Sequence, residues 1–228
     1  MQHTEISAHL ASLTKGFTPV IGGFTQEDYI SLDLSINNTD FKHFNADSSQ
    51  SIGDFIRQYL AKNDAKIAYG GYNEKRDIYN RSTHFTTTDA GSQRNIHLGV
   101  DIWADAGTAV LTPVSGKLHS FKDNTNHGDY GPCIILEHTT PQLTFYTLYG
   151  HLSRESLIYL KEGQTFKAGY EIAKLGEHFE NGDYAPHLHF QVICNMQGRM
   201  GDYPGVSSKN DLPFYLKNCP DPNLLLKI

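Results

Sequence analysis

Short apolar runs separated by turn-forming residues fill the middle of this 228-residue sequence. From His97 to Ile193, β-branched and aromatic residues come in runs that Gly, Asp, Asn and Pro interrupt. Runs of this length and composition are typical of strands in an all-β core. They predict strands at residues 97–103, 108–121, 133–138, 143–149, 165–174 and 187–193.

Two amphipathic helices are expected before this core. Residues 4–13 carry apolar side chains at helical spacing, and a longer stripe predicts a second helix at 51–63. The stripe is formed by Ile52, Phe55, Ile56, Tyr59 and Leu60. These positions share one helix face, which we expect to point toward the core. Ser51 with Asp54 resembles an N-terminal capping box, and Asn63 is expected to end the helix.

The remaining segments complete a mainly β fold with an N-terminal α+β segment. Residues 29–34 predict one strand, whereas 64–95 and 195–228 have the composition of loops. We place the boundaries so that residues 1–66 pack on a central domain of residues 67–196. A loop-rich C-terminal extension, residues 197–228, follows.

Composition limits the possible partners and compartment. Hydrophobic residues make up 39% and charged residues 19% of the chain, which is ordinary for a globular protein with a sizeable core. A net charge of −6 without a Lys/Arg cluster argues against a nucleic-acid partner. No apolar run has the length of a membrane span. The N-terminus lacks the basic start and apolar stretch of a secretion signal, so the expected location is cytoplasmic. Export by another route, or a leader removed from this chain, stays open.

Three cysteines give no sign of a disulfide framework or a zinc knuckle. Cys133, Cys194 and Cys219 are odd in number and widely spaced, without a Cys-x-x-Cys pair. We expect them to act as small core residues.

The strongest candidate for chemistry is a pair of histidines two residues apart. His187 and His189 lie in an apolar run that predicts a buried strand, so their side chains leave the same face and enter one pocket. Two neutral imidazoles suit a zinc ion, or a zinc ion with a proton-transfer partner. Because the chain has 12 histidines, such a pair can also arise by chance.

A second candidate is the motif from His97 to Asp101. Imidazole nitrogens and carboxylate oxygens are both normal zinc ligands, and Gly99 between the two residues leaves room for an ion. The interval itself is not specific, since it recurs at His43/Asp47 and His119/Asp123. The apolar, strand-like context distinguishes the 97/101 pair, whereas the 119/123 pair is expected in an exposed polar turn.

His151 follows Gly150 at the end of a predicted strand, where it can point into a cleft. Taken alone, such a residue is more often a surface or hydrogen-bonded histidine. Three ligands from His97, Asp101 and one member of the 187/189 pair would leave a fourth zinc position open, as in catalytic sites. Zinc lowers the pKa of a bound water to about 7, so a neighbouring imidazole can take or shuttle its proton. A histidine would also replace the glutamate base of the absent His-Glu-x-x-His motif.

Together these motifs resemble one family. The segments His97–Asp101, Tyr149–Leu152 and Ala185–Phe190, in this order, are similar to those of lysostaphin-type zinc endopeptidases, which cleave peptide bonds in bacterial peptidoglycan. The resemblance covers residues 95–194. It implies an antiparallel sheet or half-barrel peptidase core with a narrow groove, so that residues 67–196 would be the zinc peptidase domain.

The resemblance also implies roles for single residues. Zn2+ would be held by His97, Asp101 and His189, and the catalytic pair would be His151 and His187. The flank Tyr149–Leu152 and the closing segment 219–226 are similar to the version of this domain that is fused to class III aminotransferase-like proteins. Arg94 and Tyr184 are close enough in sequence to line the site or to lie on the surface.

The expected function is zinc-dependent endopeptidase activity on peptidoglycan fragments or related peptides. One alternative is a metal-binding but inactive peptidase-like module that acts in binding or regulation. Another is a lipoyl- or biotinyl-carrier fold, because segments 107–118 and 163–175 echo each other around glycine turns. A carrier needs a lysine at a hairpin tip, whereas Lys117 and Lys174 fall within predicted strands. Residues 1–66 are aromatic enough to cover the groove as a latency device.

Overall fold

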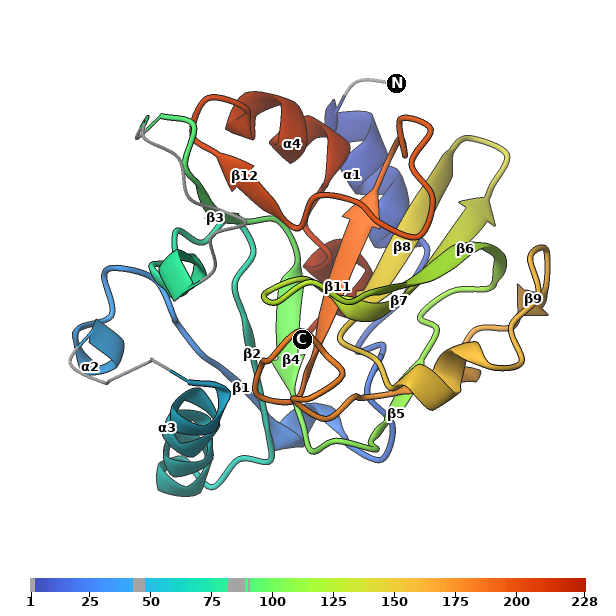
Figure 1. Ribbon diagram of the computed structural model, residues 1–228. Helices are drawn as coiled ribbons and strands as arrows, with labels where there is room; N and C mark the ends of the chain where they lie inside the picture. Colours follow the sequence, from blue (N-terminus) through green and yellow to red (C-terminus); the bar gives the residue numbers. More distant parts are fainter. Residues whose placement is uncertain (1–2, 43–47, 82–88, 90) are drawn as a thin grey trace.

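An eight-stranded sheet forms the centre of the protein in this computed structural model, which describes residues 3–42, 48–81, 89 and 91–228 (Figure 1). In spatial order its strands are β1 (Tyr29–Ser31), β2 (Ile67–Gly70), β4 (Val100–Trp103), β11 (His187–Ile193), β8 (Thr144–Gly150), β7 (Gly131–Thr139), β6 (Gly116–Asn124) and β9 (Thr165–Phe166). All neighbours are antiparallel except β1 and β2. The edge strands β1 and β9 do not pair with each other, so the described sheet is not a closed barrel.

Smaller elements surround this sheet. Two two-stranded sheets pair β5 (Ala109–Leu111) with β10 (Glu171–Lys174), and β3 (Arg94–His97) with β12 (Val206–Ser208). The α-helices are α1 (His3–Ser12), α2 (Thr39–Lys42), α3 (Ser49–Lys62), α4 (Leu212–Asn218) and α5 (Asn223–Leu226). Among the described residues, the short 3-10 helices are η1 (Gln26–Asp28), η2 (Ile78–Arg81) and η3 (Arg154–Leu157). The expected mainly β class is confirmed.

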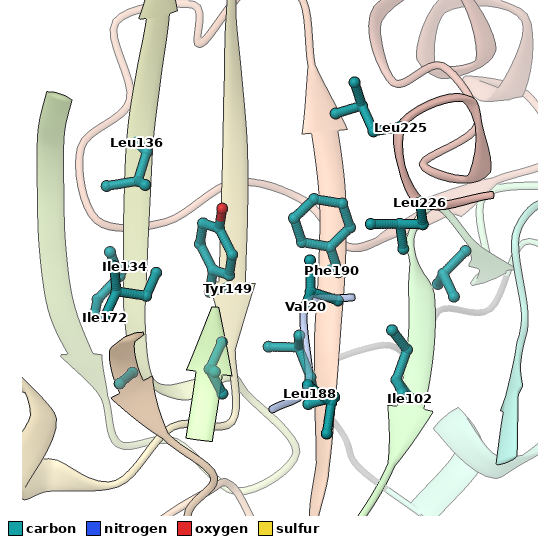
Figure 2. Close-up of a cluster of buried hydrophobic side chains, with 14 of the residues drawn as sticks. Val20, Ile102, Ile134, Leu136, Tyr149, Ile172, Leu188, Phe190, Leu225 and Leu226 are labelled. Carbon is teal, nitrogen blue, oxygen red and sulfur yellow. The ribbon is translucent and has the colours of Figure 1, made fainter. Parts of the chain in front are cut away.

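Alternation along β11 separates the core from the opposite face of the sheet. Leu188 and Phe190 enter a buried cluster with Ile102 of β4 and Tyr149 of β8 (Figure 2). Because successive side chains on a strand point to opposite faces, His187 and His189 leave the face that this cluster does not use. The apolar half of the strand therefore anchors a rigid support for its histidine half.

Three of the predicted strands form as expected, and three are interrupted. Strands at 133–138, 143–149 and 187–193 are present, while 97–103 breaks between β3 and β4. The long strands expected at 108–121 and 165–174 each split in two, and the halves join different sheets: β5 pairs with β10, and β6 with β9. Gly169, at a φ of +77°, turns the chain between β9 and β10.

Two segments expected to be loops contain regular structure. β2 lies within 64–95, and its four residues are too few for a periodic signal. The C-terminal segment holds β12, α4 and α5. Pro213 lies in the first turn of α4, where proline is tolerated because its missing N–H has no helical partner there. The expectation of a loop was therefore wrong for this part of the segment.

The N-terminal segment is built into the fold. Both expected helices form, but the cap of α3 is Ser48 and not Ser51: its hydroxyl accepts the Ser51 N–H at 3.0 Å. Asn63 ends α3 as expected, and β1 is shorter than the predicted strand. β1 pairs with β2, and α1 packs beside α5. The expected domain boundaries stay predictions.

The three cysteines are free, as expected, and two of them, Cys133 and Cys219, are buried. Within the described ranges, the helices all fall short of the length and apolarity needed to cross a bilayer.

Candidate metal centre and paired histidines

Four strands bring Gly70, Asp101, His189 and Gly150 into one row across the sheet. Asp101 of β4 lies opposite His189 of β11, Gly70 flanks Asp101, and Gly150 flanks His189. A Cβ at Gly70 would lie 2.2 Å from the Leu32 carbonyl oxygen, and a Cβ at Gly150 would lie 2.6 Å from the Tyr130 ring. Neither flanking position has room for a side chain, so the carboxylate and the imidazole are the functional groups of this row.

His97 reaches the row from outside the main sheet. It ends β3, which pairs with β12, and the chain turns at Leu98 and Gly99 before β4 begins. His97 and Asp101 therefore meet across a break and not along one strand. A Cβ at Gly99 would lie 2.6 Å from Cε1 of His189. The glycine makes room for the His189 ring, which corrects the expectation that it makes room for an ion.

Three potential ligand atoms converge at this point. His97 Nε2 lies 2.8 Å from His189 Nδ1, and Asp101 Oδ1 lies 3.2 Å from each of these nitrogens. All three residues are 3% exposed or less. Ligands about 2.0–2.1 Å from a tetrahedral zinc ion are roughly 3.3 Å apart. The spacing therefore fits three corners of a zinc tetrahedron, and the trio is a group that could hold a metal.

Outer hydrogen bonds decide which imidazole nitrogens face inward without a proton. His97 Nδ1 lies 3.0 Å from the Gly71 carbonyl oxygen, to which it can only donate. His189 Nε2 lies 2.9 Å from Oε1 of Gln191, whose amide orientation is set because its Nε2 donates to the Pro204 carbonyl at 3.1 Å. Each imidazole therefore presents a lone pair toward Asp101 Oδ1. Three hydrogen-bond acceptors that face one another repel unless a cation lies between them. Hydrogen bonds such as those from the two imidazoles to Gly71 and Gln191 are typical of metal-binding histidines.

The charge states of these groups suit the same purpose. Burial lowers the pKa of His97 to about 4, so its imidazole is neutral at pH 7. Burial alone would raise the pKa of Asp101, but His97, Arg76 and His187 together hold it well below its usual value. The neutral imidazole of His97 and the carboxylate of Asp101 are both ligands that fit zinc.

His151 and His187 form a second pair beside this centre. Their ring centroids are 4.3 Å apart, and each residue is 5% exposed. His151 Nδ1 lies 2.7 Å from the Asn181 carbonyl oxygen, and His187 Nδ1 lies 2.8 Å from the Ala185 carbonyl oxygen. Both rings are therefore oriented by a donated Nδ1–H, which leaves Nε2 free of a proton. Burial lowers both pKa values, and His187 Nε2 is 3.7 Å from Asp101 Oδ1.

The site opens into a cleft of about 340 Å³. Arg94 and Tyr184, for which the sequence left a surface position open, both line it. Leu34 and Ile52 also line it, so the N-terminal segment forms part of the wall. Whether residues 1–66 restrain activity stays a prediction.

The competing interval at His119 and Asp123 does not form a site of this kind. His119 and Asp123 lie on β6 and not in the exposed turn expected from the sequence. His119 Nδ1 contacts the Ser120 hydroxyl at 2.8 Å, whereas Asp123 pairs with Arg154 at 2.9 Å. The pair at His43 and Asp47 lies outside the described residues.

Several site residues were not predicted from the sequence. Gln191 continues the two-residue period of His187 and His189, so that signal was present. Arg76 and Gly71 lie in the stretch expected to be a loop, and Tyr130 carries no motif. Nothing in their local sequence connects them with the histidines.

Comparison with known proteins gives one family. Residues 95–200 match a family described as Peptidase family M23. Among curated protein sequences, none matches this chain.

Solved structures that are similar to this chain include those of three peptidases or peptidase-family proteins. The catalytic domain of the antimicrobial peptidase lysostaphin from Staphylococcus simulans is 26% identical, with 69% of this chain and 96% of that chain covered and a TM-score of 0.40. A zinc-containing peptidase from Vibrio cholerae is 28% identical, with 47% of this chain and 30% of that chain covered and a TM-score of 0.36. The catalytic domain of a prophage-encoded M23 protein from Enterococcus faecalis is 22% identical over 57% and 92%, with a TM-score of 0.37.

Proposed function

Because residues 95–200 match peptidase family M23, we propose that this chain is a zinc-dependent endopeptidase. Its substrate would be a peptide bond in peptidoglycan or in a related peptide. The observation that carries the proposal is the convergence of three unprotonated ligand atoms, from His97, Asp101 and His189, beside two further imidazoles in one cleft.

The ligands would be His97 Nε2, Asp101 Oδ1 and His189 Nδ1, which match the geometry and donor types of a three-residue zinc site with one position open. A zinc ion bound there would supply Lewis acidity and would lower the pKa of a coordinated water. Gly71 and Gln191 hold the two ligand imidazoles in the required tautomers. The protein itself thus fixes the positions of three ligand atoms, two of which belong to residues on buried strands of the central sheet.

His151 and His187 would move the proton. Each imidazole has Nε2 free while Nδ1–H is held by a backbone carbonyl. One of them can accept a proton from the attacking water and pass it to the amine nitrogen that leaves. A protonated ring can also stabilise the negative charge that develops on the substrate carbonyl oxygen. The Trp103 ring stacks on His187, with centroids 5.8 Å apart, and helps to fix its orientation.

The alternatives fit this arrangement less well. A binding module without activity has no need for the two imidazoles of His151 and His187 next to a complete ligand set. A carrier needs a lysine at a hairpin tip, but Lys117 lies within β6 and Lys174 within β10. The cytoplasmic location and the likeness to aminotransferase-fused versions stay predictions, which cell fractionation and the natural gene context would test.

Mass spectrometry of cell-wall fragments tests the proposed activity. Purified peptidoglycan and synthetic stem and cross-bridge peptides would be incubated with the zinc-loaded protein and with the His187→Ala variant. We expect new peptide termini with the unmodified protein and none with the variant. A zinc-loaded protein that cleaves none of these substrates would favour the inactive module.

A further inference from the structure

Arg76 is a buried arginine in the segment between β2 and η2, outside the part of the chain that matches the peptidase family. Only 4% of the residue is exposed. Its Nη1 lies 2.5 Å from Oδ2 of Asp101, and its Nε lies 2.5 Å from Oε1 of Glu74. The guanidinium therefore joins two carboxylates, one of which is a candidate metal ligand.

This contact gives the two carboxylate oxygens of Asp101 different partners. Oδ2 is held by Arg76, whereas Oδ1 faces His97 Nε2 and His189 Nδ1 at 3.2 Å each. A carboxylate with two free oxygens can bind a cation through both of them. With Oδ2 engaged in a charged hydrogen bond, only Oδ1 remains available.

We propose that Arg76 is a positioning residue that keeps Asp101 a one-oxygen ligand and thereby keeps one coordination position open for water or substrate. This inference rests on the proposed zinc site. It gives a function to a segment of the chain that precedes the family domain and that the sequence pattern marks as loop.

The support behind Arg76 explains why an arginine is needed. Glu74 Oε1 accepts the Arg76 Nε–H, and its Oε2 accepts the backbone N–H of Leu34 at 3.3 Å. The planar guanidinium offers Nε and Nη1 in fixed directions, so it can hold Glu74 and Asp101 at once. A lysine has one ammonium group on a flexible stem and cannot reproduce both contacts. The buried arginine charge is also compensated on two sides, as a buried ion requires.

Gly71 completes the support. Its φ is +105°, and a Cβ there would lie 2.1 Å from Arg76 Nη2 and 2.8 Å from His97 Nδ1. The same residue accepts the His97 Nδ1–H through its carbonyl. One glycine thus admits Arg76 and fixes the tautomer of His97, so the outer contacts of two ligands come from the same turn.

Metal binding tests this role without reference to activity. Zinc affinity would be measured by competition with a chromogenic chelator, and the coordination number by visible absorption of the Co(II)-substituted protein, for Arg76→Met, Arg76→Lys and the unmodified chain. Arg57→Met is the matched control, because that side chain is 61% exposed and pairs with Asp54. We expect Arg76→Met to bind zinc about 10–100-fold more weakly. We also expect its cobalt absorption to weaken, as four-coordinate geometry gives way to higher coordination.

Each outcome has a distinct meaning. Arg76→Lys keeps the positive charge but not the two donor groups in fixed directions. We expect this variant to fold and to show the altered cobalt spectrum. Its loss of zinc affinity should be smaller than that of Arg76→Met. Arg76→Lys therefore carries the test if Arg76→Met does not fold. Unchanged affinity and an unchanged spectrum in Arg76→Lys and in any folded Arg76→Met would overturn the role of Arg76 while leaving the zinc site intact. An unmodified chain that binds no zinc would overturn the proposed function itself, and this inference with it.

Discussion

Asp101 and His189 face each other across β4 and β11, with Oδ1 of the carboxylate 3.2 Å from Nδ1 of the imidazole. They are 88 positions apart in the sequence, and the antiparallel register of two buried strands brings them together. His97 reaches the same point from β3, across the break at Gly99. A sheet anchored by its apolar face thus holds Asp101 and His189, and the rigidity of this support underlies the predictions below.

Replacing either histidine of the second pair should stop turnover without releasing metal. His187→Ala and His151→Ala each remove a free Nε2 but leave the three candidate ligands in place. We expect the rate of peptide cleavage to fall about 10²–10⁴-fold, the usual contribution of a general acid or base. Zinc content, measured on the same samples, should stay at the level of the unmodified protein. Loss of zinc in His187→Ala would show that the roles of His187 and His189 have been exchanged.

Gln191 should matter because it accepts the Nε2–H of His189. Gln191→Leu removes this acceptor, so the ring is no longer held in the tautomer that presents Nδ1. We expect zinc affinity to fall about 10–100-fold. Gln191→Glu is the matched variant, since it keeps an acceptor oxygen and should retain most of the affinity. Equal affinities for the two variants, measured by chelator competition, would contradict this role.

Gly71 should tolerate no side chain. Gly71→Ala places a Cβ 2.1 Å from Arg76 Nη2 at a φ of +105°, so it combines backbone strain with a clash. Gly23→Ala is the control, because Gly23 has a φ of +90° with open space around the added carbon. Overpacking typically costs about 1–3 kcal/mol, so Gly71→Ala should lower the free energy of unfolding by about that much more than Gly23→Ala. Urea unfolding of both variants measures the difference, and equal losses would show that only backbone strain matters.

His138 should make stability depend on pH. It is 2% exposed, and burial lowers its pKa to about 4. In the unfolded chain the pKa is about 6.5, so the unfolded state takes up the proton first as the pH falls. The contribution of neutral His138 to the free energy of unfolding is fully present above pH 6.5. It is lost as the pH falls from about 6.5 to 4, and the loss reaches roughly 3 kcal/mol.

The variant His138→Gln isolates this effect from that of the site histidines. Urea unfolding of both proteins from pH 7.5 to 4 should give a shallower decline for the variant. Parallel declines would mean that His138 titrates alike in the folded and unfolded states.

The sequence predicts the part of the site that lies on one strand and misses the parts that depend on long-range contacts. His187 and His189 share a face because side chains alternate along β11, and the same rule would have included Gln191. His97 and Asp101 were predicted together from their residue types and apolar context, but the break in the chain between them was not. The resemblance supplied the choice of His189 over His187 as the third ligand.

Arg76 shows the other limit. Its segment has the composition of a loop, and its partners Glu74 and Asp101 are brought together by β2 pairing with β4. No local pattern encodes that pairing. The two predicted long strands failed for a related reason, because each half found a partner in a different sheet. Local propensity gave the strand-forming residues but not where the chain turns.

Zinc content of purified variants tests the central claim most directly. Elemental analysis would compare the unmodified chain with His189→Ala and His187→Ala after incubation with equal zinc and removal of the excess. We predict about one zinc ion per chain for the unmodified protein and for His187→Ala, and almost none for His189→Ala. A His189→Ala protein that holds as much zinc as the unmodified chain would contradict a site built from His97, Asp101 and His189.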